Sequence, residues 1–363
     1  MENTTKAVIA VTIIVVLALG VYATSVLYPG SSTSASSSSS STSSSSHVDV
    51  NVGFFLNINH APALLGYSSG AFQDALGPSM TIHRLLFTQG GPEMIALLAG
   101  QIDIGYVGPS PSVNAYTQSG GTGLKILAGV TSGGAVLVVQ GDSAIENASD
   151  LAGKTIGSPG LGNTQDVALR YYLMDHGYSP CSQAGCGSVT VQASSNSAVV
   201  LAFAQHQIDG AWVPEPYGEV LMQQYGGRLF LDERSLWPGG NFSTAVLVVR
   251  TQFLEQHPDI VRAFVAADVA ETIWINQHPA EALTNLNATL SAELQQVFAP
   301  NVLNASLNRL AFTYDPLKTS VATQAEHAYQ LGFLTQEPTD LSGLYDLSIL
   351  NSVLTERGLP TIQ

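Results

Sequence analysis

Hydrophobic positions from His47 onward alternate between short apolar runs and longer stretches with helical spacing. Runs of Val, Ile and Phe bounded by Gly or Pro are typical of strands, and apolar residues three and four apart are typical of helices. The pattern predicts strands at 48–55, 82–87, 104–107, 124–130, 135–139, 154–157, 189–192, 210–213, 228–231 and 244–249. Between them it predicts helices at 62–72, 92–99, 112–118, 165–175, 198–205 and 217–225. After Arg250 it predicts only helices, at 258–276, 280–285, 292–298, 316–330 and 344–357. Strands alternating with helices indicate an α/β protein with largely parallel sheets.

Two internal similarities indicate that the α/β pattern occurs twice. Gln101-Ile-Asp-Ile-Gly-Tyr-Val-Gly-Pro109 resembles Gln207-Ile-Asp-Gly-Ala-Trp-Val-Pro-Glu215, at an offset of 106 residues (207 minus 101). Val52-Gly53 and Ile156-Gly157 each lead through a loop to an Asn and a helix, at an offset of 104 residues (156 minus 52). We therefore expect two similar α/β lobes. Lobe one is expected at 47–138 plus 245–363 and lobe two at 139–244, because the apolar strands 135–139 and 244–249 flank the second cycle.

The N-terminal part has a different composition. Residues 7–28 form an uncharged run of 22 residues after Lys6, long enough to cross a bilayer. Residues 31–46 are almost pure Ser, which behaves as a flexible tether. We expect a membrane anchor or signal segment at 1–28 and a tether at 29–46. A cleaved signal peptide remains the alternative, and both alternatives place the body outside the cytoplasm.

Composition excludes several classes of function. The chain has 27 acidic and 12 basic residues and a net charge of −15, which argues against nucleic acid as a partner. Two Cys are too few for a disulfide scaffold or a four-Cys zinc site; Cys181 and Cys186 are equally compatible with a disulfide and with free thiols. The motifs G-x-S-x-G, P-loop and H-E-x-x-H are absent from the sequence, and no cofactor or metal is expected.

Several loops that join a predicted strand to a predicted helix could together bind an anion. Helix N-termini carry free N–H groups and a partial positive charge, so several of them in one cleft can hold an oxyanion without a cationic side chain. We expect His60 to assist an anion when it is protonated at low pH. Asp166 and Arg170, four apart, are interpreted as a helix-surface pair. Trp212 is expected at the wall of the cleft or in the core, and Glu215 at the ligand or at a backbone hinge. The predicted ligand-binding residues are Asn59, His60, Gly90, Gly91, Ser110, Ser132, Asn163, Thr164, Gln165, Trp212 and Glu215.

Five segments resemble the nitrate/sulfonate/taurine-type substrate-binding proteins of ABC transporters. They are Asn59-His60-Ala-Pro62, Ala96-Leu-Leu-Ala-Gly-Gln-Ile-Asp-Ile-Gly105, Asp150-Leu-Ala-Gly-Lys-Thr-Ile-Gly157, Gly162-Asn-Thr-Gln165 and Ala211-Trp-Val-Pro-Glu-Pro216. The resemblance spans about 48–277. It implies a two-lobed periplasmic-binding-protein-like fold of type II, in which each lobe is a mostly parallel sheet flanked by helices, with a helical C-terminal tail.

The resemblance also implies a function. A small anion, such as an aliphatic sulfonate or nitrate, is captured between the lobes and delivered to an ABC permease and its ATPase. The protein is then expected to be a monomeric, non-catalytic receptor. Its N-terminal membrane helix and Ser tether depart from the family, whose members are usually lipidated or free in the periplasm. The alternatives are a binder of a pyrimidine or vitamin precursor and an extracytoplasmic enzyme with His60 and Glu215 as an acid–base pair.

Overall fold

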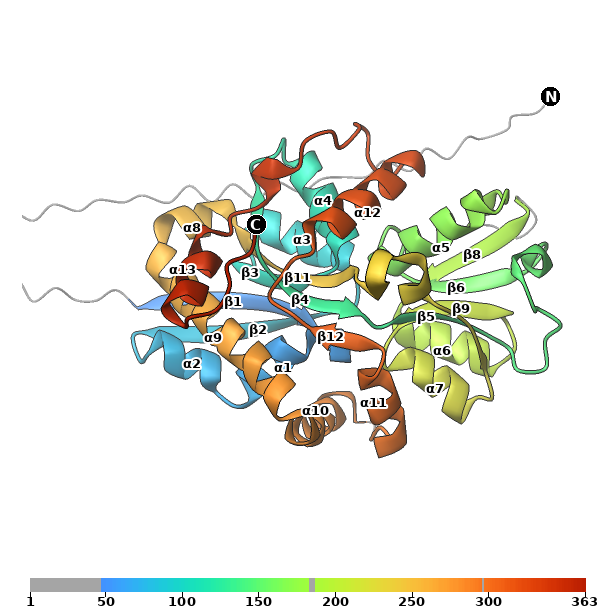
Figure 1. Cartoon of the computed structure of the whole chain (residues 1–363), viewed down its shortest axis with the longest axis horizontal. Helices are drawn as coiled ribbons and strands as arrows, with labels where there is room; N and C mark the ends of the chain where they lie inside the picture. The colour runs from blue at the N-terminus through green and yellow to red at the C-terminus, as the bar shows by residue number, and fades with distance from the viewer. Residues whose placement is uncertain (1–46, 183–186, 296) are drawn as a thin grey trace, which may run out of the picture. The chain divides into compact units, whose positions relative to one another are not determined.

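Two six-stranded sheets organise the protein, as the computed structural model shows (Figure 1). Residues 47–182, 187–295 and 297–363 are described. The first sheet has the order β12-β4-β11-β3-β1-β2, formed by β1 (Val48–Phe55), β2 (Met80–Phe87), β3 (Ile104–Val107), β4 (Leu124–Gly133), β11 (Ser243–Arg250) and β12 (Leu310–Phe312). The second has the order β10-β5-β9-β6-β8-β7, formed by β5 (Ala135–Val139), β6 (Thr155–Pro159), β7 (Pro180–Cys181), β8 (Val189–Ser194), β9 (Gly210–Pro214) and β10 (Arg228–Asp232).

Helices flank both sheets and dominate the C-terminal part (Figure 1). Those that alternate with strands are α1 (Ala61–Ser68), α2 (Ala71–Leu76), α3 (Gly90–Leu98), α4 (Pro109–Gln118), α5 (Thr164–Asp175), α6 (Asn196–Ala204) and α7 (Tyr217–Gln224). The C-terminal ones are α8 (Thr251–Gln256), α9 (Pro258–Gln277), α10 (Pro279–Leu294), α11 (Pro300–Leu307), α12 (Lys318–Gln330) and α13 (Ser348–Glu356). Short 3₁₀ helices are η1 (Ile58–His60), η2 (Ala148–Leu151), η3 (Glu233–Leu236), η4 (Pro238–Gly240) and η5 (Ser342–Leu344). The expected α/β class is confirmed.

The helical tail differs from the prediction around residue 290. The sequence predicts two helices, at 280–285 and 292–298, where the structure has one helix, α10, that ends at Leu294. The intervening Asn, Thr and Ser residues have low helix propensity, but Leu286 and Leu290 lie one turn apart and are both buried. Burial of this face therefore outweighs propensity. The helix ends where Gln295 adopts a left-handed conformation with φ of 53°. The short elements α8, α11, β7 and β12 were not predicted.

The internal repeat occupies equivalent positions in the two sheets. In the first sheet β1 pairs in parallel with β2 and β3, and β3 pairs antiparallel with β11. In the second, β6 pairs in parallel with β8 and β9, and β9 pairs antiparallel with β5. The Asp of each repeated motif has the same role. Asp103 Oδ2 accepts a hydrogen bond from Asn51 N at 3.0 Å, and Asp209 Oδ2 accepts one from Thr155 N at 2.8 Å.

The chain passes directly from one sheet to the other between β4 and β5. Gly133 and Gly134 make this passage, both with φ of 76°, a region that favours Gly. A Cβ at Gly134 would lie 2.9 Å from Asn59 Nδ2 and 3.0 Å from Leu310 Cβ, so a side chain has no room there. The chain returns to the first sheet through η3 and η4, which precede β11.

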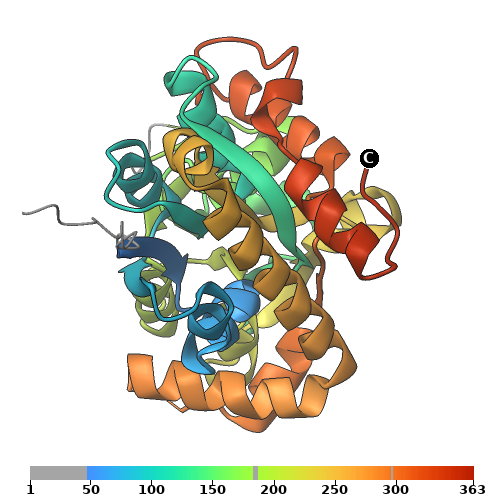
Figure 2. The ribbon, with the colours of Figure 1, turned by 90° about the vertical axis from the view of Figure 1, so that its left-hand side faces the viewer.

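Each sheet has its own apolar core, and the C-terminal helices enlarge the first. Val261, Phe264 and Val265 of α9 are fully buried in one cluster with residues of β1 and β4. Figure 2 shows α9 crossing the molecule with α13 beside it, and these two helices are in contact. Leu137, Ile156 and Trp212 belong to the second-sheet core.

The expectations about the N-terminal segment and about the two cysteines fall partly on residues that the structure does not describe. Among the described residues no helix is long and apolar enough to span a membrane. The predicted anchor at 1–28 and tether at 29–46 lie outside the described residues. Cys181, at the end of β7, is disulfide-bonded, and Cys186 also lies outside the described residues.

Candidate functional site

A small cavity of about 30 Å³ lies where the two sheets face each other. Almost all of its lining residues follow the carboxyl ends of parallel strands: β1, β2 and β3 in the first sheet, and β6, β8 and β9 in the second. This is where open α/β sheets bind ligands. The lining residues are Phe55, Asn57, Asn59, His60, Thr88, Gly90, Gly108, Pro111, Pro159, Asn163, Thr164, Gln165, Asn196, Pro214 and Thr244. We refer to this space as the cleft.

The cleft is polar but carries no ionic side chain, because none of its lining residues is Asp, Glu, Lys or Arg. Four helices of eight or more residues begin at it: α3, α4, α5 and α6. Their first turns carry free N–H groups and partial positive charge. Dipoles of this kind are suited to holding a small anion without a cationic side chain. Within the described residues, no three His, Cys, Asp or Glu side chains come together as a metal site.

His60 is a neutral hydrogen-bond donor in this site. Its ring stacks on Phe55 with centroids 4.7 Å apart, and its Nδ1 accepts a hydrogen bond from Phe55 N at 3.3 Å. Burial lowers the pKa of His60 to about 3. Because Nδ1 is the acceptor, the ring proton is on Nε2, which can donate to a ligand. The expectation that a protonated His60 assists an anion at low pH therefore fails at every pH above this lowered pKa.

Asn59 fastens η1 to the passage between the sheets. Its Nδ2 donates to Thr244 Oγ1 at 3.2 Å and to the Gly133 carbonyl at 3.3 Å, while its own carbonyl accepts from Thr131 Oγ1 at 2.6 Å. Its Oδ1 is buried without a hydrogen-bond partner, as is Oδ1 of Asn57. Buried acceptors of this kind are costly unless a ligand or water donates to them. The cleft thus offers acceptors beside its N–H donors.

Asn163 and Thr164 bring the second sheet against the first. Asn163 stands at the N-cap of α5, yet its side chain makes no bond to its own helix; its Oδ1 accepts a hydrogen bond from Gly90 N, at the start of α3, at 3.1 Å. Thr164 Oγ1 is buried without a partner. A Cβ at Gly108 would lie 2.2 Å from that oxygen. The two sides of the cleft are therefore in direct contact. Gly108 makes this contact possible because it has no side chain that would collide with Thr164.

Asp166 and Arg170 shape the loop that presents these residues. Their ion pair measures 2.9 Å and is buried. Asp166 also accepts hydrogen bonds from Ser158 Oγ at 2.5 Å and from Gly162 N at 2.8 Å. The expectation of a helix-surface pair is wrong because the carboxylate turns inward to satisfy the loop between β6 and α5. The spacing of four residues is the same in both arrangements, so it could not distinguish them.

Other predicted ligand residues lie near the cleft or away from it. Gly91 is exposed in the first turn of α3, and Ser110, at the start of α4, is buried with an unpartnered Oγ; neither lines the cleft among the described residues. Ser132 Oγ accepts a hydrogen bond from Phe242 N at 3.3 Å and lines a separate surface cavity. Trp212 is buried in the second-sheet core, where its Nε1 donates to Glu233 Oε2 at 2.8 Å.

Glu215 lies at the junction between α7 and the C-terminal helices. Its Oε2 accepts hydrogen bonds from Glu219 N at 3.1 Å and Ser306 Oγ at 3.0 Å, and Arg309 Nε lies 3.2 Å from its Oε1. Arg309 also pairs with Glu219 at 2.9 Å and with Asp232 at 3.2 Å. Burial raises the pKa of Glu215 to about 7. These contacts are compatible with the backbone-bonding role left open by the sequence, and Glu215 is absent from the cleft lining among the described residues.

Nine cleft residues are not in the predicted ligand-binding set: Phe55, Asn57, Thr88, Gly108, Pro111, Pro159, Asn196, Pro214 and Thr244. Thr88 follows β2 and Asn196 follows β8, and these strands are equivalent in the two sheets. Extending the internal repeat by one more strand would have identified both. Thr244 lies inside β11, where an apolar run gives no signal for a ligand contact.

Two sheets flanked by helices, with a polar cleft between their strand ends, define the fold of the periplasmic binding proteins. The NMT1-like family pattern matches residues 43–289, and the chain belongs to this family. The chain is 28% identical over 220 residues to the taurine-binding periplasmic protein of Escherichia coli strain K12, a match that covers 61% of this chain and 65% of that protein. The matched part thus spans less than two thirds of that relative.

Solved structures share the fold. The nitrate-binding protein NrtA from Synechocystis PCC 6803 superposes with a TM-score of 0.71 at 16% identity, covering 86% of this chain and 89% of that one. The alkanesulfonate-binding protein SsuA from Xanthomonas axonopodis pv. citri, bound to MOPS, gives a TM-score of 0.64 at 19% identity, covering 80% and 95% of the two chains. The predicted two-lobed class and C-terminal helical region are confirmed at the level of the fold.

Proposed function

We propose that this protein is an extracytoplasmic receptor of an ABC importer that captures a small anion, of the aliphatic sulfonate or nitrate type, in the cleft. The observation that carries the proposal is the cleft itself: four helix N-termini meet in a buried, polar space with no ionic side chain. Neutral donors solvate an anion there without attracting cations. The taurine-binding and alkanesulfonate-binding relatives support this ligand class.

Binding and release require the two lobes to move. We retain the predicted lobes, 47–138 plus 245–363 and 139–244, but shift their boundaries by a few residues, because β5 from Ala135 belongs to the second sheet and β11 from Ser243 to the first. The space in the cleft, about 30 Å³, is on the order of two water molecules, so a sulfonate enters only when the lobes part. The hydrogen bond from Gly90 N to Asn163 belongs to the closed arrangement. A ligand that binds a closed arrangement, with the cleft widened to its size, more tightly than the open one shifts the population towards closure.

The ligand contacts we propose are Asn59, His60, Gly90, Asn163, Thr164 and Gln165 from the predicted set, with Asn57 and Asn196 added. The unpartnered Oδ1 atoms of Asn57, Asn59 and Asn196 are acceptors. They would favour a ligand that carries N–H groups besides its anionic head, such as an aminosulfonate. Taurine and ethanesulfonate differ by one ammonium group, so their relative affinities report on these acceptors.

The proposed partners are an ABC permease and its ATPase, with the N-terminal segment as membrane anchor and the protein as a monomer. We propose no catalysis. Glu215 is bound to Ser306 and Arg309 and does not line the cleft with His60, which leaves the acid–base pair of the enzyme alternative unsupported. The pyrimidine alternative is a competing ligand in the same screen.

The test is a thermal-shift screen of the purified full-length chain with taurine, ethanesulfonate, nitrate and a pyrimidine, followed by calorimetry of each hit. Taurine or ethanesulfonate should stabilise the protein, and Thr164→Ala should weaken binding by about 0.5–1.5 kcal/mol, or up to about 3 kcal/mol for a charged partner. The hit should be recovered unchanged after incubation. Stabilisation by the pyrimidine alone, or conversion of a hit, would reject the proposal.

A further inference from the structure

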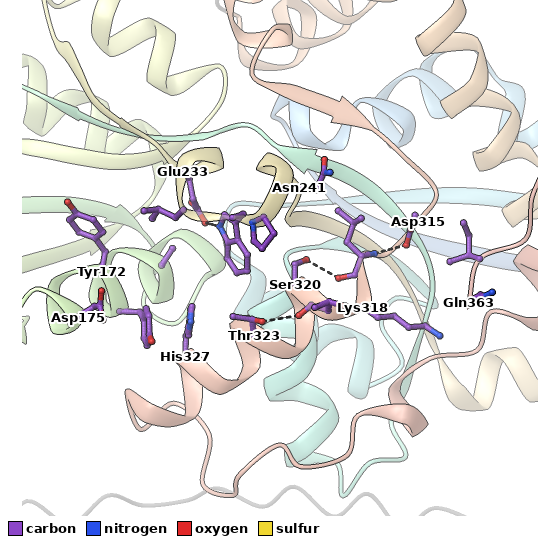
Figure 3. Close-up of a pocket in the computed structure, with 18 of the residues that line it drawn as sticks. Tyr172, Asp175, Glu233, Asn241, Asp315, Lys318, Ser320, Thr323, His327 and Gln363 are labelled. Carbon is purple, nitrogen blue, oxygen red and sulfur yellow. Dashed lines mark hydrogen bonds between the residues drawn. The ribbon is translucent and has the colours of Figure 1, made fainter.

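A second, much larger cavity lies outside the cleft. It has a volume of about 770 Å³ and is lined by the C-terminal half of α5, by η3 and η4, and by α12 with the last residues of the chain. Figure 3 shows Tyr172, Asp175 and His327 at one end, with Asp315, Lys318 and Gln363 towards the other. We refer to it as the α5–α12 cavity. It shares no lining residue with the cleft.

Aromatic side chains form one end of the α5–α12 cavity and are held in place. Tyr171 of α5 stacks on His327 of α12 with ring centroids 3.4 Å apart and planes at 9°. Trp237 stacks on Phe242 at 5.4 Å and lies 6.1 Å from the His327 ring. Aromatic faces fixed in advance bind an organic cation at low entropic cost.

Glu233 fixes the indole of Trp237 to the second-sheet core. Its Oε1 accepts a hydrogen bond from Trp237 Nε1 at 3.3 Å, while its Oε2 accepts one from the buried Trp212 at 2.8 Å. One carboxyl group therefore ties a core ring to a cavity ring. The position of Trp237 in the cavity wall is therefore fixed by a hydrogen bond to a residue of the protein interior.

The charges at the aromatic end favour a cation. Asp175 is exposed at the end of α5 and is close enough to His327 to influence its titration. Burial lowers the pKa of His327 to about 4, so its ring is neutral near pH 7 and does not repel a positive ligand. The one Lys in the lining, Lys318, has its Nζ 5.1 Å from the centre of the Tyr345 ring, at the far end of the cavity. Asp315 adds a second negative charge to the lining.

We propose that the α5–α12 cavity is a second ligand site, which takes an organic cation with an apolar or aromatic body. The ammonium group lies against Trp237 and the Tyr171–His327 pair near Asp175, and the body extends along the cavity towards Ile362. The site is independent of the anion in the cleft.

The probe is phenyltrimethylammonium, with tert-butylbenzene as its neutral counterpart of the same shape. Titration of the full-length chain is followed by tryptophan fluorescence, since Trp237 lines the cavity. Saturable binding of the cation below about 1 mM is expected, with the neutral compound at least about fivefold weaker. Asp175→Asn should weaken cation binding about two- to fivefold, and Trp237→Leu by about tenfold.

Two controls locate the site. Asp74→Asn, at an exposed position on α2, should leave cation binding unchanged, as should Thr164→Ala in the cleft. Asp175→Asn removes an exposed carboxylate, so it remains informative even if Trp237→Leu fails to fold. The proposal is overturned by absence of saturable binding, by equal affinity for the neutral compound, by an unchanged affinity in Asp175→Asn, or by loss of binding in Thr164→Ala.

Discussion

The titration of Asp268 tests how burial of a carboxyl group changes the unfolding free energy of this protein with pH. It lies on α9, fully buried in the core of the first sheet, where its Oδ1 accepts a hydrogen bond from Tyr106 Oη at 2.6 Å and its Oδ2 has no partner. Burial raises the pKa of Asp268 to about 7; the Tyr106 hydroxyl opposes this shift and the nearby Glu271 adds to it. The ordinary value is 3.8, so the folded protein holds this proton far more tightly than the unfolded chain.

The sign and size of the effect follow from linkage. The stabilising contribution of Asp268 is fully present below pH 3.8 and is lost as the pH rises through about 7, because the folded state must then bury a charge. A rise of the pKa from 3.8 to about 7 corresponds to about 4 kcal/mol over the whole range and to roughly 2–3 kcal/mol between pH 5 and pH 8. Asp268→Asn removes this titration and keeps an acceptor oxygen for Tyr106.

The assay is urea unfolding of the full-length wild type and Asp268→Asn at pH 5, 6, 7 and 8. The variant should gain roughly 2–3 kcal/mol of unfolding free energy relative to wild type between pH 5 and pH 8. Other buried acids, such as Glu215 and Glu233, cancel in this difference. Asp142→Asn, at an exposed position, should show no such change. If the difference between Asp268→Asn and wild type does not vary with pH, the argument from burial is refuted.

Three further predictions concern the Arg309 network, the closed cleft and the N-terminal segment. Arg309→Met should lower the unfolding free energy by about 3 kcal/mol, because it leaves three carboxylates without their shared cation. Arg262→Met, which breaks an exposed pair with Glu356, should have a much smaller effect, and equal effects of the two variants in urea unfolding would contradict the role of the Arg309 network. Gly108→Ala should weaken ligand binding with little change in stability, since its Cβ meets Thr164 only across the closed cleft. Gly91→Ala, which has open space around it, is the calorimetric control, and unchanged affinity in Gly108→Ala would argue against closure. Deletion of residues 1–46 should leave a folded, monodisperse protein in light scattering; aggregation of the shortened chain would mean that the segment belongs to the core.

The bounds of secondary-structure elements could be predicted best where one pattern of apolar and polar positions fills a whole element. The bounds of β1, β3 and β5 are as predicted, because β1 begins with alternating apolar and polar residues and β3 and β5 are short, mostly apolar runs. The two similar cycles led to Asn59, His60, Asn163 and Thr164, which the fold brings into one cleft.

Positions that depend on tertiary contacts could not be predicted. Trp212 has the same local pattern whether it faces a ligand or a core, and only its bond to Glu233, 21 residues away, decides. The neutral state of His60 depends on its complete burial. The α5–α12 cavity is lined by segments that are far apart in the sequence; Tyr171 and His327, which stack on each other, are 156 residues apart (327 minus 171). No local sequence motif predicts such a cavity.

The most direct test of the account is the location of the bound anion. Backbone amide signals of the ¹⁵N-labelled protein can be followed while the anion that gives the largest thermal shift is added. The account predicts that the amides of Gly90, Thr164 and Gln165 move together and saturate at one equivalent, because they lie at the start of α3 and α5 on opposite sides of the cleft. Shifts that leave these three amides unchanged and appear elsewhere would contradict it.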